Sequence, residues 1–74
     1  MQSYANLGGD SGISGYEIGD GEIVVAFSKG GTYRYTDARA GAQHVAQMQL
    51  LAQEGQGLNT YINKYVRGNY TDKW

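Results

Sequence analysis

The sequence predicts an α+β fold: a three-stranded antiparallel β-meander with two C-terminal helices packed on one of its faces. Three observations lead to this fold class. Glycine-containing turns join short segments of alternating apolar and polar residues, the apolar residues of these segments fall on one shared face, and two later segments have apolar residues at helical spacing. The chain has 74 residues and no cysteine, so we expect one small domain held by packing rather than by disulfides.

Residues 1–12 are predicted to form a flexible leader, and residues 13–74 a single domain. The first twelve residues are rich in glycine and polar side chains and have no hydrophobic periodicity, which is typical of a mobile terminus. The run Gly9-Asp10-Ser11-Gly12 matches the residues around the nucleophile of trypsin-like proteases. We interpret this match as coincidence, because the chain is far too short for that two-barrel fold and a catalytic triad needs a positioned His and Asp.

The first predicted strand covers residues 13–18 and is followed by the hairpin signal Asp20-Gly21. Both residues tolerate the positive φ that the central positions of a type I′ turn require. A two-residue loop at this point pairs Ile18 with Ile23. Because side chains alternate along a strand, this register places the apolar residues of both strands on the same face.

The second connection, Lys29-Gly30-Gly31, is predicted to be a three-residue loop that pairs Phe27 with Tyr33. A two-residue loop would place Phe27 opposite Arg34, so the hydrophobic pattern favours the longer loop. The shared apolar face then consists of Tyr16, Ile18, Ile23, Val25, Phe27, Tyr33 and Tyr35. Because the helices must cover this face, we expect Tyr33 and Tyr35 to be core residues; the alternative is that their rings are exposed platforms for base stacking.

Two helices are predicted after the meander. Asp37 fits the N-cap of a helix from Ala38 to Glu54, and Gly55 fits its C-terminal stop. The apolar face of this helix, with Gln49 near its middle, consists of Ala38, Ala42, Val45, Ala46, Met48 and Ala52. A second helix, from Leu58 to Arg67, carries apolar residues at i, i+3, i+4, i+7 and i+8: Leu58, Tyr61, Ile62, Tyr65 and Val66. The tail, residues 69–74, is expected to pack in part through Tyr70 or Trp74.

Charge is distributed unevenly along the chain, although the net charge of −1 gives no global attraction for nucleic acid. Before residue 29 the four charged side chains are all acidic; from Lys29 onward six basic side chains oppose three acidic ones, so the sums are −4 and +3. Such asymmetry is typical of a basic binding surface, but it also arises by chance in a short chain. No apolar run approaches the roughly 20 residues of a membrane span and no signal peptide is recognisable, so we expect a cytoplasmic protein without a membrane partner.

The stretch Phe27-x-x-Gly30-x-x-Tyr33-Arg34-Tyr35 resembles the centre of the KTSC domain family. This family is named for the C-terminus of some lysyl-tRNA synthetases and also occurs as stand-alone bacterial proteins. The resemblance covers about residues 13–66, with departures at Gln53, Leu58 and Asn63. It marks five residues as a structural motif: Phe27, Tyr33, Tyr35, Asn59 and Ile62. It implies a small binding module, for which the synthetase context suggests RNA, such as tRNA, as the ligand.

The candidate ligand-binding residues are four basic side chains: Lys29, Arg34, Lys64 and Arg67. Arg34 is predicted on the sheet face opposite the tyrosines, above a shallow hollow at Ala26 and Gly15, where a guanidinium suits a phosphate or carboxylate. The alternative is an exposed arginine that reaches Glu17. Asn59 either caps the second helix or contacts a ligand.

The sequence therefore predicts a non-enzymatic binding module, with RNA or another nucleic acid as its partner. The alternative is a protein-interaction or self-association domain, because a three-stranded meander leaves two sheet edges open to pairing. We expect no catalytic residue, metal or cofactor, since no nucleophile–base pair or group of metal ligands can be assembled from these residues.

Overall fold

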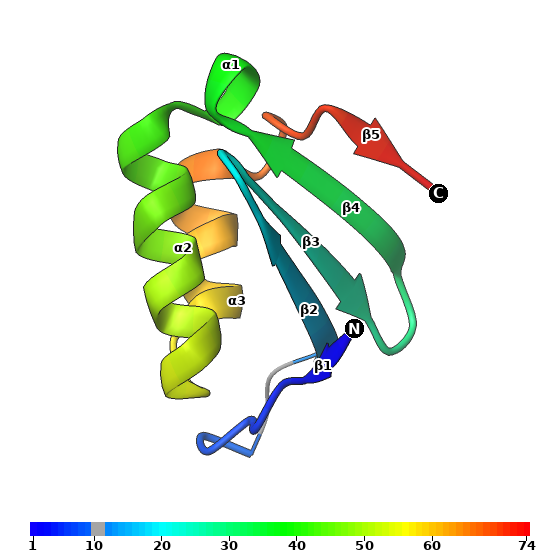
Figure 1. The fold of residues 1–74 in the computed structure, drawn as a ribbon. Helices are drawn as coiled ribbons and strands as arrows, with labels where there is room; N and C mark the ends of the chain where they lie inside the picture. The colour runs from blue at the N-terminus through cyan, green and yellow to red at the C-terminus, as the bar shows by residue number, and fades with distance from the viewer. Residues whose placement is uncertain (10–11) are drawn as a thin grey trace.

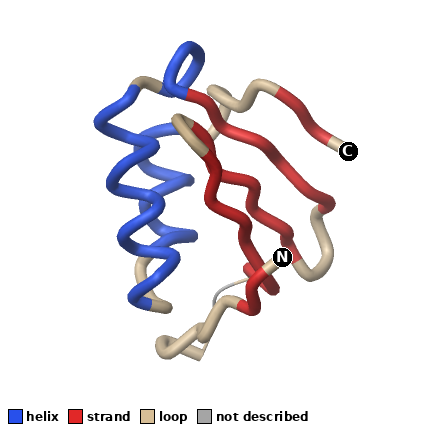
Figure 2. The backbone as a smooth tube through the Cα atoms, viewed as in Figure 1, coloured by secondary structure: helices blue, strands red, loops and turns tan. Residues whose placement is uncertain are grey.

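A computed structural model describes residues 1–9 and 12–74, and these residues form two layers. One layer is a five-stranded antiparallel sheet with the order β1-β2-β3-β4-β5. The strands are β1 (Gln2–Ser3), β2 (Ile13–Gly19), β3 (Glu22–Phe27), β4 (Gly31–Thr36) and β5 (Asp72–Lys73). The other layer contains the helices α2 (Ala42–Glu54) and α3 (Leu58–Tyr61) and the π-helix η1 (Ile62–Val66). These helices lie on one face of the sheet, as Figure 1 and Figure 2 show.

The predicted α+β class is confirmed, but the sheet has two strands more than the predicted meander. The additional strands, β1 and β5, lie at the two edges and contain two residues each. A two-residue strand shows no alternation of apolar and polar residues, so hydrophobic periodicity could not reveal either one.

The first hairpin has the predicted pairing with a different turn. Ile18 pairs with Ile23 across the loop Asp20-Gly21, as expected. Gly21 has a φ of 69°, whereas Asp20 does not have a positive φ, so the expected type I′ turn is wrong. Further along β2, a bulge between Ile13 and Gly15 shifts the alternation by one residue and buries Ile13 in the core.

The register of the second hairpin differs from the prediction by two residues. Phe27 pairs with Gly31 and Val25 pairs with Tyr33, so the loop is Ser28-Lys29-Gly30. This register pairs every residue of β3 with a residue of β4, whereas the predicted register would leave Glu22 and Ile23 without partners in β4. A shift of two keeps each side chain on its face, because the side-chain period of a strand is two. The predicted apolar face therefore survives the wrong register.

The predicted helix from Ala38 to Glu54 is interrupted. A single turn, α1 (Asp37–Ala40), is separated from α2 by Gly41, whose φ is 100°. Asp37 is the first residue of α1 and not its N-cap; Thr36 precedes it and makes no capping bond through its side chain. The predicted stop is confirmed: Gly55 has a φ of 81° and donates its N–H to the carbonyl of Leu51 at 3.0 Å.

The alanines that are buried differ from those predicted on the apolar face. Three alanines predicted on the apolar face are exposed: Ala38, Ala42 and Ala46. Ala40 is buried instead, together with the predicted residues Val45, Met48 and Ala52. The break at Gly41 accounts only for the alanines that precede it, Ala38 and Ala40. Ala42 and Ala46 lie in α2 outside a buried stripe that is narrower than the predicted face.

The second predicted helix forms, but it continues from α3 into a π-helix. Leu58, Ile62 and Val66 are buried, while Tyr61 is half-buried and Tyr65 is 48% exposed. The buried residues are four apart, which is a narrower apolar stripe than the predicted one. The polar side chains of η1 and the residue after it, Arg67, face away from the core.

The N-terminal segment differs from the expected leader, because it takes part in the fold. β1 pairs with β2, and Tyr4 is buried in the core. The Tyr4 hydroxyl accepts a hydrogen bond from the backbone N–H of Leu58 at 3.3 Å. Asp10 and Ser11, the central pair of the protease-like run, lie outside the described residues.

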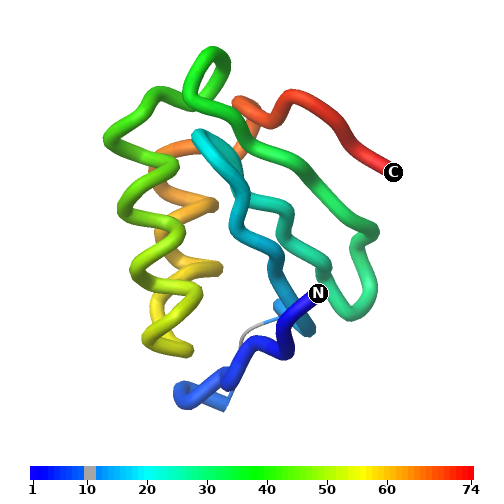
Figure 3. The backbone as a smooth tube through the Cα atoms, in the orientation of Figure 1, coloured from blue at the N-terminus to red at the C-terminus, as the bar shows by residue number. Residues whose placement is uncertain are grey.

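The C-terminal tail lies along β4, and Figure 3 shows the two chain ends at opposite edges of the sheet. Of its two aromatic side chains, Tyr70 packs against the core and Trp74 is 66% exposed. The Trp74 backbone instead exchanges two hydrogen bonds of 2.8 Å with Thr32. No helix in the described part of the chain has the length and apolar character needed to cross a bilayer.

Candidate binding cavity

A cavity of about 240 Å³ lies between β4 and the η1 segment. The sheet contributes aromatic side chains, the turn before β4 contributes a glycine, and η1 with the residues after it contributes polar and apolar side chains. Its lining residues are Phe27, Gly30, Tyr33, Tyr35, Ile62, Asn63, Arg67 and Tyr70. We call it the tyrosine cavity. It contains Arg67 from the predicted binding residues and four of the five motif residues.

The aromatic rings of the tyrosine cavity pack against one another. The Tyr33 ring contacts Phe27 edge-on at 5.5 Å between centroids, Tyr70 edge-on at 5.1 Å and Tyr35 in a stacked arrangement at 6.5 Å. Tyr35 is 1% exposed, so its interpretation as a core residue is confirmed. Tyr33 and Phe27 are half-buried and line the open part of the cavity.

The hydroxyl groups of Tyr33, Tyr35 and Tyr70 are near one another and have no hydrogen-bond partner among the described residues. The pKa of Tyr35 is raised to about 12, mainly by burial and to a lesser extent by the neighbouring phenols of Tyr33 and Tyr70. At neutral pH Tyr35 therefore keeps its proton and can donate a hydrogen bond. The tyrosine hydroxyls that do bond protein groups are those of Tyr4 and Tyr61, outside this cavity.

Positive charge borders the tyrosine cavity without a balancing carboxylate. Arg67 lines the cavity and makes no ion pair with any described residue. Lys73 pairs with Tyr33 in the sheet, and its Nζ lies 5.6 Å from the centre of the Tyr33 ring. Lys29 lies exposed in the turn that supplies Gly30. No acidic side chain is among the described residues that line the cavity.

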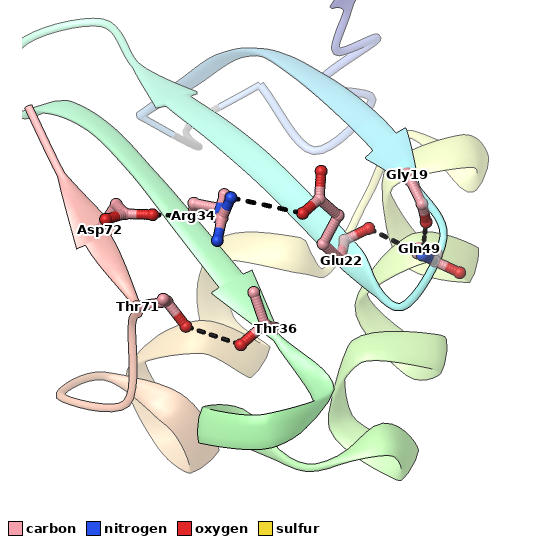
Figure 4. Close-up of polar contacts among 7 residues, drawn as sticks. All are labelled: Gly19, Glu22, Arg34, Thr36, Gln49, Thr71 and Asp72. Atoms are coloured by element: carbon pink, nitrogen blue, oxygen red, sulfur yellow. Dashed lines mark hydrogen bonds and ion pairs between the residues drawn. The ribbon is translucent and has the colours of Figure 1, made fainter.

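Arg34 lies on the opposite, uncovered face of the sheet and is held by two carboxylates. Its Nη1 lies 3.6 Å from Oε1 of Glu22, and its Nε lies 3.0 Å from Oδ2 of Asp72 (Figure 4). The contact of Nε with Asp72 is an ion pair and not a hydrogen bond, because the N–H does not point at the carboxylate oxygen closely enough. The alternative of an exposed arginine near an acidic residue thus describes Arg34 better, although its partners are Glu22 and Asp72 rather than Glu17.

The predicted hollow beneath Arg34 is wrong. In the observed register Arg34 is opposite Val24 instead of Ala26. Gly15 is paired with β1, and a side chain there would meet the carbonyl of Gln2 at 2.8 Å. The hollow depended on the register and on an open edge at β2, and neither is present.

Lys64 belongs to a third surface. Its Nζ lies 5.5 Å from the centre of the Tyr65 ring, which contacts Tyr61 and His44. Nδ1 of His44 is hydrogen-bonded to the Tyr61 hydroxyl at 2.6 Å. Burial, and to a lesser extent the phenol of Tyr65, raise the pKa of Tyr61. The four predicted basic residues therefore do not form one site: Arg67 is in the cavity, with Lys29 beside it in the turn, Lys64 is over Tyr65, and Arg34 is on the other face.

A second, polar cavity of about 220 Å³ lies beside the N-terminal segment. It is lined by Tyr4, Asn6, Gly8, Gln56, Gly57, Asn59 and Thr60. Asn59, the remaining motif residue, does not cap the second helix, because Gly57 occupies the cap position and no side chain bonds the helix start. Its Oδ1 instead accepts a 3.5 Å hydrogen bond from Nδ2 of Asn63.

Sequence reasoning missed two residues as site candidates: Tyr70, which lines the tyrosine cavity, and Lys73, which lies beside it over the Tyr33 ring. Tyr70 and Lys73 lie in the tail, and only the pairing of β5 with β4 brings Lys73 to Tyr33. The available signal was weak: a tyrosine in a polar tail that suggested packing. Within the described residues, no group of three or more His, Cys, Asp or Glu side chains is arranged to hold a metal ion.

Comparison of the chain with protein-family models, curated proteins and solved structures found no match. The resemblance to the KTSC family therefore stays a prediction that depends on the residues quoted above.

Proposed function

We propose that this chain is a non-enzymatic module that binds single-stranded RNA through the tyrosine cavity. The observation that carries the proposal is the combination of aromatic walls with a guanidinium that no described carboxylate neutralises. The resemblance to a domain of some lysyl-tRNA synthetases supports RNA as the nucleic acid.

Single-stranded nucleic acid is bound by aromatic rings and basic side chains acting together. The half-buried rings of Tyr33 and Tyr70 offer stacking surfaces at the cavity. Arg67 offers a planar set of donors suited to a phosphate. Lys73 and Lys29 extend the positive charge along β4 and its turn, where a strand leaving the cavity would run.

Arg34 is not part of this proposed site, because Glu22 and Asp72 already neutralise it on the other face of the sheet. It therefore provides a matched control for Arg67. Both substitutions, Arg67→Gln and Arg34→Gln, remove one guanidinium from the surface of the same sheet–helix domain.

The test is fluorescence anisotropy of a labelled unstructured RNA at low salt. We expect Arg67→Gln to weaken binding about tenfold, the effect of losing one charge-assisted hydrogen bond, and Arg34→Gln to change it less than twofold. A fourfold rise in salt should weaken wild-type binding about 20-fold if three phosphates are contacted. Absence of binding by the wild-type protein, or equal losses in the two variants, would contradict the proposal.

The protein-interaction alternative makes a different prediction. β1 and β5 occupy the outer positions of the sheet, so self-association through an edge would have to pair these two-residue strands with another chain. Sedimentation equilibrium that shows a salt-insensitive dimer, without RNA binding, would favour this alternative.

A further inference from the structure

We infer that the tyrosine cavity recognises the terminal phosphate of an RNA strand, a phosphate monoester rather than an internal phosphodiester. This inference rests on the proposed RNA-binding function and adds the chemical group that enters the cavity.

The first argument is the set of hydrogen-bond donors. Three phenol groups, those of Tyr33, Tyr35 and Tyr70, line one cavity without a hydrogen-bond partner among the described residues. Arg67 adds a guanidinium with several N–H groups. A phosphate monoester presents three terminal oxygens, each able to accept more than one hydrogen bond. The ligand thus matches an excess of donors that the protein itself leaves unused.

The second argument is charge. Arg67 lines the cavity and Lys73 lies over the Tyr33 ring, whereas Glu22 and Asp72 are on the other sheet face with Arg34. A neutral polar ligand would use the hydroxyl groups but would leave Arg67 without a counter-charge. A terminal phosphate carries a charge of about −1.5 to −2 at neutral pH, more than the single charge of an internal phosphate.

The third argument is the size and shape of the cavity. Its volume of about 240 Å³ is below the roughly 300–1,000 Å³ of sites that enclose drug-sized ligands. The buried side chains of Tyr35 and Ile62 line it on the sheet side and on the helix side. A terminal phosphate needs less room there than an internal phosphate, which has a nucleotide on both sides.

The experiment compares three RNAs of identical sequence: one with a 5′-phosphate, one with a 3′-phosphate and one with hydroxyl groups at both ends. The affinity of the full chain for each is measured by fluorescence anisotropy with an internal label. We expect one of the two phosphorylated RNAs to bind about tenfold more tightly than the unphosphorylated RNA, and the arm that gains affinity identifies the end that is recognised.

Tyr70→Phe and Arg67→Gln are the test variants. Tyr70→Phe removes one hydroxyl and keeps the ring, so we expect it to reduce the preference for the phosphorylated RNA several-fold. Tyr65→Phe removes the hydroxyl of an exposed tyrosine outside the cavity and should leave the preference intact. Thermal unfolding of each variant confirms that it is folded.

The outcomes separate the inference from the function on which it rests. If all three RNAs bind equally and Arg67→Gln weakens all of them, RNA binding stands and terminal-phosphate recognition is overturned. If a preference is present but Tyr65→Phe reduces it as much as Tyr70→Phe, the assignment to this cavity is overturned. If none of the RNAs binds, the proposed function fails, and the inference fails with it.

Discussion

Gln49 connects the helix layer to the first hairpin through a single side-chain amide. Its Nε2 donates hydrogen bonds to the backbone carbonyls of Gly19, at 3.2 Å, and Glu22, at 2.9 Å (Figure 4). These carbonyls flank the loop between β2 and β3, so the bonds hold the hairpin end against α2. The position of Gln49 near the middle of an apolar helix face, which is unusual for a polar residue, is explained by these two bonds.

We predict that Gln49→Ala lowers the free energy of unfolding by about 1–3 kcal/mol, because two half-enclosed carbonyls lose their donor. Gln47→Ala is the control, since Gln47 is exposed on the same helix. Urea denaturation of both variants measures the effect. Equal stability of the two variants would contradict the connecting role of Gln49.

Tyr35 is predicted to make stability depend on alkaline pH. Its pKa is about 12 in the folded protein and about 10 in an unfolded chain, so between these values the unfolded state has released a proton that the folded state keeps. Stability from this residue is complete below pH 10 and is lost as the pH rises toward 12. The unfolding midpoint in urea should therefore fall more steeply over this range in the wild-type protein than in Tyr35→Phe. Parallel pH profiles of the two proteins would show the prediction to be wrong.

At the scale of elements, two glycines decide where α2 begins and ends. Gly41 has a φ of 100° and separates α1 from α2, and Gly55 has a φ of 81° and ends α2. The left-handed region costs residues with a side chain about 1–2 kcal/mol, so glycine is favoured at both positions. At Gly55 space is limiting as well, because a Cβ there would lie 2.6 Å from Cβ of Ala5.

Gly55→Ala is accordingly expected to destabilise the protein by about 1–3 kcal/mol, through backbone strain and the contact with the N-terminal segment. Gly68→Ala is the matched control: a Cβ there meets no atom within 4 Å, and Gly68 has no positive φ. Thermal unfolding compares the two variants. A loss for Gly68→Ala as large as that for Gly55→Ala would contradict this account of the helix end.

At the scale of the whole molecule, the first and last segments of the chain both pack into the sheet–helix domain. β1 adds to one edge and β5 to the other, and Tyr4 and Tyr70 pack at the core. The tail also supplies Asp72 to Arg34 and Lys73 to Tyr33, so the ends influence both faces of the sheet. Glu22, from the acidic first part of the chain, forms an ion pair with Arg34, from the basic second part. This ion pair neutralises the positive charge of Arg34.

The integration of the N-terminal segment is tested by Tyr4→Ala. Tyr4 is 6% exposed and bonds Leu58, so we expect a loss of about 3–5 kcal/mol, as for other buried aromatic residues. Tyr65→Ala, at an exposed tyrosine, should cost much less. If residues 1–12 were a detached leader, Tyr4→Ala would have nearly the wild-type free energy of unfolding in chemical denaturation and would lose less stability than Tyr65→Ala.

The candidate site was only partly predictable. Arg67 was selected for its place on the polar face of the second helix, and Tyr33 and Tyr35 for their place on the apolar face of β4. Their meeting in one cavity depends on how η1 lies against the sheet, and the contribution of Tyr70 and Lys73 depends on the tail returning to β4. The predicted hollow beneath Arg34 came from a two-residue error in register, which placed Arg34 opposite Ala26 when it is opposite Val24.

Local sequence patterns were sufficient to predict the fold class, the helix-facing side of β3 and β4, and the end of α2 at Gly55. Each of these depends on a local property: the period of two in a strand, helical spacing, or the conformational freedom of glycine. The register of β3 against β4, the two edge strands and the tyrosine cavity became evident only in the folded protein. These depend on contacts between residues far apart in the chain, and segments as short as β1 and β5 have no periodicity from which such contacts could be inferred.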